Sequence, residues 1–151
     1  VAANMMHSLH EMAQFTMTAS FDAAELLAYR ERANAATDAS RRLTINDLVV
    51  FAASRVLPAF PYMNAHYGEE DLKLFDRVHM GIAVDTEKGL YVPVVKDADR
   101  MSLFGISAAI KDLAARCREG RIGAGDESAR SAISNACSAW VAGEAPRCTR
   151  W

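Results

Sequence analysis

Residues 79–96, HMGIAVDTEKGLYVPVVK, predict two strands joined by a tight turn, and this hairpin decides the fold. From position 78 to position 85, bulky side chains alternate with small or polar ones, the period of a strand whose successive side chains point to opposite faces. The bulky set is Val78, Met80, Ile82 and Val84, and the small or polar set is His79, Gly81, Ala83 and Asp85. Residues 86–89, a polar run that ends in glycine, predict the turn. The bulky face suits a core, whereas the small face suits either another backbone or a ligand.

The bulk properties indicate one globular domain. The chain has 151 residues, 51% of them hydrophobic and 24% charged, which is long enough to bury a core. A formal net charge of −2 argues against a general electrostatic attraction to nucleic acid or anionic lipid. No apolar run reaches the roughly 20 residues that a membrane helix needs. The three cysteines form no CxxC pair, and their odd number argues against a disulfide framework and favours a reducing, intracellular location.

Two helices and a strand are predicted in the first part of the chain. An amphipathic helix is expected over residues 2–13, because its apolar residues fall on one stripe. Alternating residues predict a strand over Phe15–Asp22. A second helix is expected over about 23–36, with Asp22 as its cap.

The clearest helix of the chain is predicted behind Thr44 and Asp47, which resemble a capping box with aspartate in place of the usual glutamate or glutamine. Pro58 and Pro61 end this helix, since proline removes a backbone donor. Its predicted buried stripe is Ile45, Leu48, Val49, Ala52, Ala53, Val56, Leu57 and Phe60.

Short strands are predicted near residues 63–67 and 72–75, before the hairpin. After the hairpin, Ser102 is expected to cap a last long helix. The side chains expected to face inward from it are Leu103, Ile106, Ile110, Leu113, Ala114 and Cys117. Cys117 is therefore expected to be a small core residue rather than a nucleophile.

Three stretches, in order, resemble the catalytic domain of dihydrolipoamide acyltransferases, the core components of 2-oxo acid dehydrogenase complexes. Residues 2–30 are similar to the helix and strand that begin this domain. Residues 43–67, LTINDLVVFAASRVLPAFPYMNAHY, are similar to its central helix with the FPxxNA ending. Residues 81–122 resemble its most recognisable block, GIAVxTxxGLxxPVxxxAD followed by a helix.

The resemblance implies a fold and a reaction. The fold is expected to be α/β and similar to chloramphenicol acetyltransferase, a two-layer sandwich of helices on a mixed sheet, with its C-terminal part missing. Homotrimers or a larger core are expected, with active sites in channels between subunits. The family exchanges an acyl group between dihydrolipoamide and coenzyme A, so the coenzyme and the lipoyl group are the expected substrates, a lipoyl domain is an expected partner and no metal is expected. A histidine serves as base on the attacking thiol, and a serine hydroxyl stabilises the oxyanion.

Two site residues carry over by motif. Ser134, in the segment AISN, corresponds to the serine of the family's TISN segment and is the candidate oxyanion donor. Asp85, in GIAVDT, corresponds to an aspartate beside the pantetheine or lipoamide arm and is the candidate substrate-binding residue. Without the resemblance, Ser134 is an ordinary polar residue and Asp85 simply ends a strand.

The family's catalytic histidine belongs to a DHRxxDG motif, and this sequence contains no such motif. The match runs from residue 2 to about 123, so residues 1–123 are expected to form the N-terminal part of the catalytic domain. Residues 124–151 diverge from the pattern and are expected to be poorly ordered, and residues 136–151 look like a truncated or out-of-frame ending. We therefore expect this chain to be inactive or nearly so.

The other histidines offer no clear replacement for the missing base. His79 lies six residues before Asp85 on one strand, about 20 Å away at 3.3 Å per residue, so the two cannot form a dyad. His66 lies before a turn and has no better claim. His7, His10 and Glu11 lie within one helical turn of each other, but a solvated helix face explains them as well as a metal site does.

Two other functions fit the same residues. One is a non-catalytic assembly or binding module that retains the fold, and the other is a stand-alone enzyme related to chloramphenicol acetyltransferase. The GIAVDT block and the central helix favour the dehydrogenase-complex family. Location in the cytoplasm, or in the mitochondrial matrix of a eukaryote, is expected, and the sequence does not reveal which acyl group is carried.

Overall fold

The predicted hairpin is present in the computed structural model, which describes residues 16–67, 71–87, 89–123 and 132–133 together with Met6 and His10. Its strands are β3 (His79–Gly81), β4 (Val84–Thr86), β5 (Gly89–Tyr91) and β6 (Val94–Val95). Met80 lies opposite Val95 and Val84 lies opposite Tyr91, so the register is the same on both sides of the interruption between β3 and β4. The Ile82 N–H donates to the carbonyl oxygen of Pro93 at 2.9 Å and bridges that interruption.

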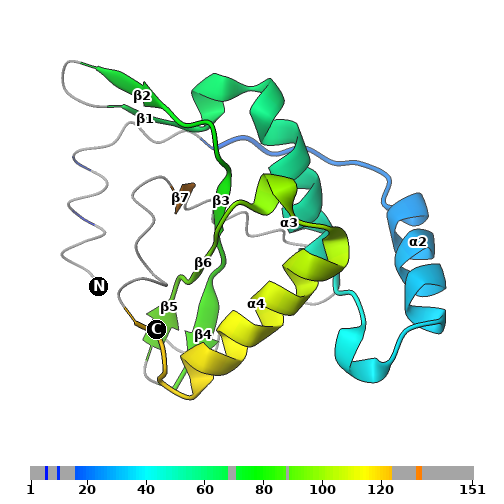
Figure 1. Ribbon diagram of the computed structural model, residues 1–151. Coiled ribbons are helices and arrows are strands. Elements are labelled where there is room, and N and C mark those ends of the chain that lie inside the picture. Colours follow the sequence, from blue (N-terminus) through cyan, green and yellow to red (C-terminus); the bar gives the residue numbers. More distant parts are fainter. Residues whose placement is uncertain are drawn as a thin grey trace.

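The sheet around β3 is mixed, as predicted. Strand β6 pairs with one edge of β3 in the antiparallel sense, and β7 (Ala132–Ile133) pairs with the other edge in the parallel sense. A separate hairpin is formed by β1 (Ala65–Tyr67) and β2 (Leu72–Leu74), close to the predicted bounds. Helices α3 (Ile45–Val56) and α4 (Leu103–Arg118) pack on each other and on the central hairpin (Figure 1). This architecture confirms the predicted α/β class.

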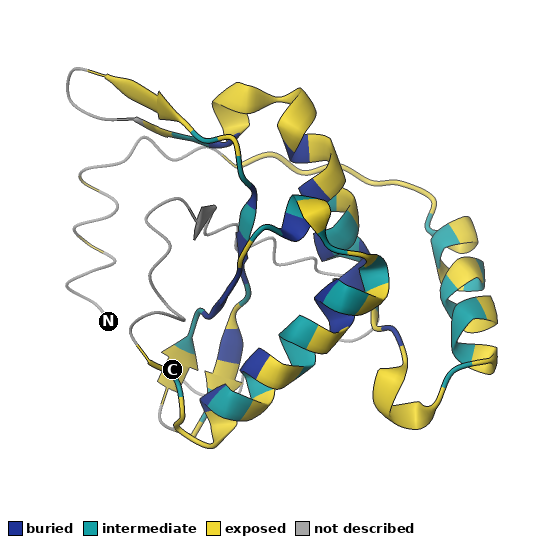
Figure 2. Cartoon of the chain, in the orientation of Figure 1, coloured by how far each residue is buried: buried dark blue, intermediate teal, exposed yellow. Residues whose placement is uncertain are grey.

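The bulky face of the hairpin forms the core with α3 and α4. Val78 and Met80 are 1% and 2% exposed, and Val84 is buried as well. The buried cluster consists of Val50, Leu57, Val78, Met80, Val95, Ala98, Ile106 and Leu113. Figure 2 shows the buried positions gathered where the two helices meet the hairpin. Burial of this apolar area is the dominant stabilising term of the fold.

Helix α3 begins with the predicted capping box. The Thr44 hydroxyl accepts from the Asp47 N–H at 3.2 Å, and the Asp47 carboxylate accepts from the Thr44 N–H at 2.8 Å. Because the aspartate side chain is short, it lies close against the helix and is only 1% exposed. A hydroxyl from α4, that of Ser107, donates to the same carboxylate oxygen at 2.9 Å. The box therefore also ties the start of α3 to α4.

The buried face of α3 differs from the predicted apolar stripe. Asp47, Leu48, Val50 and Ser54 are buried, whereas Val56 is 54% exposed. Phe60, which follows the short helix η2 (Leu57–Ala59), is also 54% exposed. Asp47 and Ser54 can be buried because each has a hydrogen-bond partner; Ser54 donates to the carbonyl oxygen of Phe51 at 2.7 Å. The predicted stripe was wrong at Ala52, Val56 and Phe60, which are exposed, and it left out the buried Val50. It also left out Asp47 and Ser54, because hydrophobicity alone does not show which polar residues find partners inside.

Helix α4 starts at its predicted cap. The Gly105 N–H donates to the Ser102 hydroxyl at 3.1 Å. Ile106, Leu113 and Cys117 are buried, as predicted for the inward face. Cys117 is 2% exposed, in accord with its assignment to the core.

Helix α2 (Ala24–Ala35) stands apart from the core and buries none of its residues (Figure 2). Asp22 accepts a hydrogen bond from the Ala24 N–H at 2.9 Å, so it caps the helix start from one position further out than a standard N-cap. The Asn34 side chain anchors the other end, because its amide donates to the Leu43 carbonyl and its oxygen accepts from the Leu43 N–H.

The strand predicted over Phe15–Asp22 is wrong for its described part. Residues 16–23 form no strand, and Met17 and Phe21 are 82% and 77% exposed. A strand needs a neighbour that takes up its backbone N–H and C=O groups, and none of the described strands pairs with this segment. The helix predicted over residues 2–13 lies mostly outside the described residues; Met6 and His10 are helical, and Met6 is 55% exposed. No helix in the described ranges is both long and apolar enough to cross a bilayer.

Candidate functional site

The small-residue face of the hairpin is not part of the core cluster. Gly81 is buried, His79 is half-buried, and Ala83 and Asp85 are exposed. Strand alternation places these four side-chain positions on the face opposite Val78, Met80 and Val84. The face thus becomes more open from the base of the hairpin toward its turn, and Asp85 lies at the open end.

Asp85 is held by the short antiparallel pair β4–β5. It lies opposite Leu90, which is 67% exposed, so neither residue is covered by the described part of the chain. The turn beyond it is fixed by the Thr86 hydroxyl, which donates to the Gly89 carbonyl oxygen at 2.8 Å. Gly89 has a φ of +124°, a conformation that favours glycine and explains why this residue type closes the turn. Asp85 is therefore an exposed carboxylate on a short, hydrogen-bonded strand pair.

Ser134 lies outside the described residues. The strand that directly precedes it in the sequence, β7, lies beside β3, with Ala132 opposite His79 and Ile133 opposite Met80. From Met80 to Asp85 is five residues, or about 17 Å along an extended strand. The structure therefore brings β7 to the base of the hairpin and holds Asp85 near its tip.

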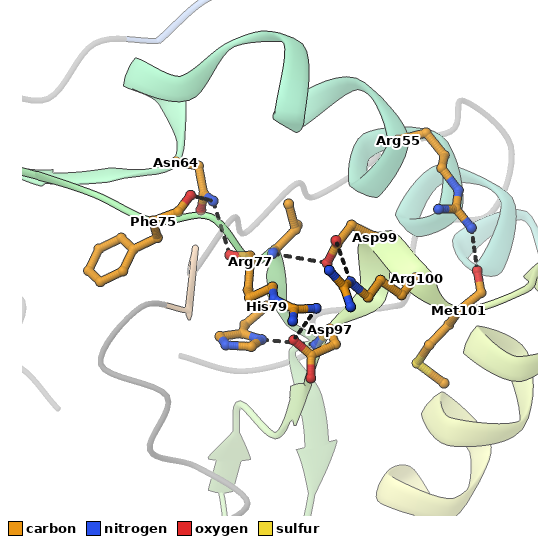
Figure 3. Close-up of polar contacts among 10 residues, drawn as sticks. Arg55, Asn64, Phe75, Arg77, His79, Asp97, Asp99, Arg100 and Met101 are labelled. Carbon is orange, nitrogen blue, oxygen red and sulfur yellow. Dashed lines mark hydrogen bonds and ion pairs between the residues drawn. The ribbon is translucent and has the colours of Figure 1, made fainter.

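A polar clamp, defined by residues 77–79 and 97–99, holds the base of the hairpin (Figure 3). The Ala98 N–H donates to the Val78 carbonyl oxygen at 2.9 Å, and the Val78 N–H donates to Asp99 at 3.1 Å. The Asp97 N–H donates to Nδ1 of His79 at 2.9 Å. No recognised motif predicts this clamp; its one signal in the sequence is the run DADR (residues 97–100), directly after a predicted strand.

Asn64 forms a second polar contact that no sequence pattern predicts. Its side-chain nitrogen donates to the carbonyl oxygens of Phe75 and Arg77 at 2.8 and 3.0 Å (Figure 3). Its buried Oδ1 has no hydrogen-bond partner among the described residues. These bonds fix the chain just before β3, which explains why an asparagine follows the FPxx run at this position.

None of the described histidines is placed beside Asp85 to act as a base on a substrate thiol. His79 uses Nδ1 for the clamp at the other end of the strand. The ring of His66 packs edge-on against Phe75, with 5.1 Å between the ring centres. His7 and Glu11 lie outside the described residues, and His10 is exposed on its helix. Within the described ranges no cluster of three or more histidine, cysteine or acidic residues is arranged to hold a metal ion.

A shallow pocket lies elsewhere, between the end of α2 and the start of α4. Its volume is about 220 Å³, and it is lined by Ala36, Thr37, Asp38, Arg41 and Phe104. It contains none of the residues singled out from the sequence.

A family model described as 2-oxoacid dehydrogenases acyltransferase (catalytic domain) matches residues 1–146. The chain is 39% identical over 119 residues to the dihydrolipoyllysine-residue acetyltransferase component of the pyruvate dehydrogenase complex of Mycobacterium tuberculosis, covering 76% of this chain and 22% of that protein. It is 36% identical over 143 residues to the corresponding Bacillus subtilis component, covering 92% of this chain and 32% of that protein. The family model and the Bacillus subtilis match both reach beyond residue 123, where the recognisable motifs end.

Solved structures agree with these matches. The Azotobacter vinelandii dihydrolipoamide acetyltransferase, studied for the catalytic roles of a serine, a histidine and an asparagine, superimposes with a TM-score of 0.80 at 32% identity. The match covers 85% of this chain and 54% of that one. A catalytic core of the 2-oxoacid dehydrogenase multienzyme complex from Thermoplasma acidophilum gives a TM-score of 0.77 at 32% identity, covering 85% and 59%. The chain thus spans a third or less of these curated relatives and a little over half of these solved chains.

Proposed function

Because this chain belongs to the family of 2-oxoacid dehydrogenase acyltransferase catalytic domains, we propose that it forms part of a site for thioester exchange between dihydrolipoamide and coenzyme A. The observation that carries the proposal is the small-residue face of the hairpin. The side chains of the bulky face pack in the core, while Ala83 and Asp85 stay exposed on the opposite face. Small side chains on this face leave room for a long, thin substrate arm.

Asp85 is the proposed substrate-binding residue. The pantetheine arm of coenzyme A and the lipoamide arm both carry amide N–H groups, and an exposed carboxylate accepts hydrogen bonds from such donors. Ser134 is the proposed oxyanion donor, since a hydroxyl aimed at the developing negative charge lowers the barrier to acyl transfer. Two observations support this role: the AISN motif and the position of β7, which directly precedes the serine in the sequence.

The proposed substrates and partners follow from the relatives. We propose coenzyme A and a lipoyl group carried on a lipoyl domain, with no metal. A homotrimer or larger core is proposed because a similar solved structure is the cubic core of a pyruvate dehydrogenase multienzyme complex. A cytoplasmic or mitochondrial-matrix location is proposed because the relatives include a mitochondrial component from Arabidopsis thaliana and bacterial ones.

Binding at the hairpin tests the proposal. Titrating the isotope-labelled chain with coenzyme A, and separately with dihydrolipoamide, should shift the amide resonances of Gly81–Thr86 and Gly89–Tyr91. Asp85→Ala should weaken the binding of at least one of the two about 3- to 10-fold, the size expected for the loss of one typical hydrogen bond at a solvent-exposed position. Glu87→Ala is the matched control, because it removes the same charge from an exposed position two residues away. Shifts confined to other surfaces, or equal effects of the two variants, would refute the assignment.

The chain assayed alone is expected to show no catalytic turnover of acetyl-coenzyme A and dihydrolipoamide. Acetyl transfer from acetyl-coenzyme A to dihydrolipoamide should stay at the rate of the uncatalysed reaction, because the DHRxxDG motif is absent and no described histidine is positioned as the base. Formation of S-acetyldihydrolipoamide is followed by chromatography. Transfer clearly above background would contradict this expectation, and His→Gln variants at the four histidines would then identify the base.

A second candidate function is a non-catalytic assembly module. It is favoured by large apolar side chains that stay exposed around the end of α3, in η3 (Pro61–Met63) and on β2. These are Val56, Phe60, Tyr62, Met63, Leu72 and Leu74. Light scattering tests it: a stable trimer or larger particle without measurable substrate binding supports the module, whereas a monomer that binds coenzyme A excludes it.

A further inference from the structure

We propose that His79 is a positioning residue whose Nδ1 holds the turn at Asp97 and, through it, the strand on which β7 pairs. The inference concerns how the site is held together, and it rests on the proposed function only in assigning Ser134 to that site. His79 is the first residue of β3, and its main chain lies opposite Ala132 of β7. Its side chain reaches in the other direction along the sheet, to the turn that follows β6.

The hydrogen bond fixes the chemistry of the ring. The Asp97 N–H can donate only to a ring nitrogen that carries a lone pair, so Nδ1 is unprotonated in the bonded state. A neutral imidazole then carries its proton on Nε2. In Figure 3 the other ring nitrogen points away from Asp97, so the clamp uses one side of the ring only.

Asp97 needs such a partner because of its backbone conformation. Its φ of 51° and ψ of 38° place it in the left-handed region, and it is the only non-glycine residue with positive φ in the described ranges. Residues other than glycine, asparagine and aspartate rarely adopt this conformation, which persists where surrounding contacts hold it. The Asp97 carboxylate also pairs with Arg77 at 3.8 Å, but both side chains are about half exposed, so water screens that contact.

The rest of the clamp transmits the effect to β3. Both backbone groups of Val78 hydrogen-bond to the segment that begins at Asp97. Its carbonyl oxygen accepts from the Ala98 N–H, and its N–H donates to the Asp99 carboxylate. If the turn at Asp97 loosens, these bonds lose their alignment, and β3 is the strand against which β7 lies. Holding the turn therefore holds β3, the strand beside which β7 lies, and Ser134 follows β7 directly in the sequence.

Three variants separate this role from simple packing. In His79→Asn the side-chain oxygen takes the place of Nδ1 and can accept from the Asp97 N–H. In His79→Gln the side-chain amide lies near the position of Nε2 instead. In His79→Ala no side-chain acceptor remains at either position. The Asn variant should keep the melting temperature within about 1 °C of wild type, whereas the Gln and Ala variants should lower it by about 3–6 °C. The rate of amide hydrogen exchange at Asp97 and Ile133 should be unchanged in His79→Asn. In His79→Gln and His79→Ala it should rise about tenfold or more.

A spectroscopic measurement tests the ring directly and needs no variant. Long-range proton–nitrogen correlation of the wild-type imidazole should show Nδ1 unprotonated and Nε2 protonated. The proposal is overturned if Nδ1 carries the proton, or if His79→Asn is as damaging as His79→Ala. Neither readout depends on coenzyme A or lipoamide, so failure here is distinct from failure of the proposed function.

Discussion

The substitution Ile106→Ala is expected to lower the free energy of unfolding by about 3–4 kcal/mol, because it opens a cavity at the centre of the core. Ile106 is 0% exposed and packs in the cluster where α4 meets α3 and the hairpin. Its neighbours are fixed on three different elements, so they cannot collapse into the space without moving a helix or a strand. Urea unfolding followed by circular dichroism measures the change as a lower midpoint with an unchanged slope.

Two matched substitutions make the Ile106 result specific. Ile106→Val removes one methylene and should cost about 0.5–1.5 kcal/mol. Leu90→Ala removes a similar amount of side chain from a residue that is 67% exposed and should stay within about 0.5 kcal/mol of wild type. Equal losses for Ile106→Ala and Leu90→Ala would show that α4 does not pack on the hairpin as described.

The second large effect is expected at Asp47. Asp47→Ala should lower the free energy of unfolding by about 2–4 kcal/mol, because it removes the capping box of α3 and leaves the buried Ser107 hydroxyl without its acceptor. The loss exceeds that of an exposed helix cap, since Asp47 is 1% exposed and Ser107 is 2% exposed. Chemical denaturation of the variant gives the value directly.

A double-mutant cycle isolates the bond between the two helices. Ser107→Ala alone should cost less than Asp47→Ala, because the capping box of Thr44 and Asp47 survives it. The double variant should be about 1 kcal/mol more stable than the sum of the single effects predicts. Asp47→Asn serves as the isosteric control, since it keeps one carbonyl acceptor. Additive effects would mean that the Ser107 hydroxyl does not interact with Asp47 in solution.

Local patterns were enough to predict most of the fold. The hairpin, the capping box and the Ser102 cap follow from residues within four positions of each other, and the structure confirms all three. The buried face of α3 could not be predicted in full, because Asp47 is satisfied by a hydroxyl 60 residues away. The strand expected before Asp22 failed for a related reason: alternation shows that a segment can form a strand, not that a neighbour is present to pair with it.

The candidate site was less predictable than the fold. Asp85 and Ser134 came from resemblance to a family, because a carboxylate at a strand end or a serine after one is by itself ordinary. His79 and Asp97 are 18 residues apart in the sequence, and their contact depends on the left-handed backbone conformation of Asp97. No local sequence pattern predicts that conformation. The single hint was aspartate directly after a strand, a residue type that tolerates this conformation.

The unbroken register of the hairpin has a consequence for how this domain can vary. From Val78 to Asp85 the side chains alternate between two faces of the hairpin. Even-numbered positions face the core, and odd-numbered positions form the small-residue face of the proposed site. Inserting or deleting one residue within these strands would turn Asp85 toward the helices and a valine toward the substrate, so the core packing and the proposed site would be lost together. Changes of two residues would keep each side chain on its present face. The length of this hairpin is therefore expected to change in steps of two, with odd changes confined to the turn.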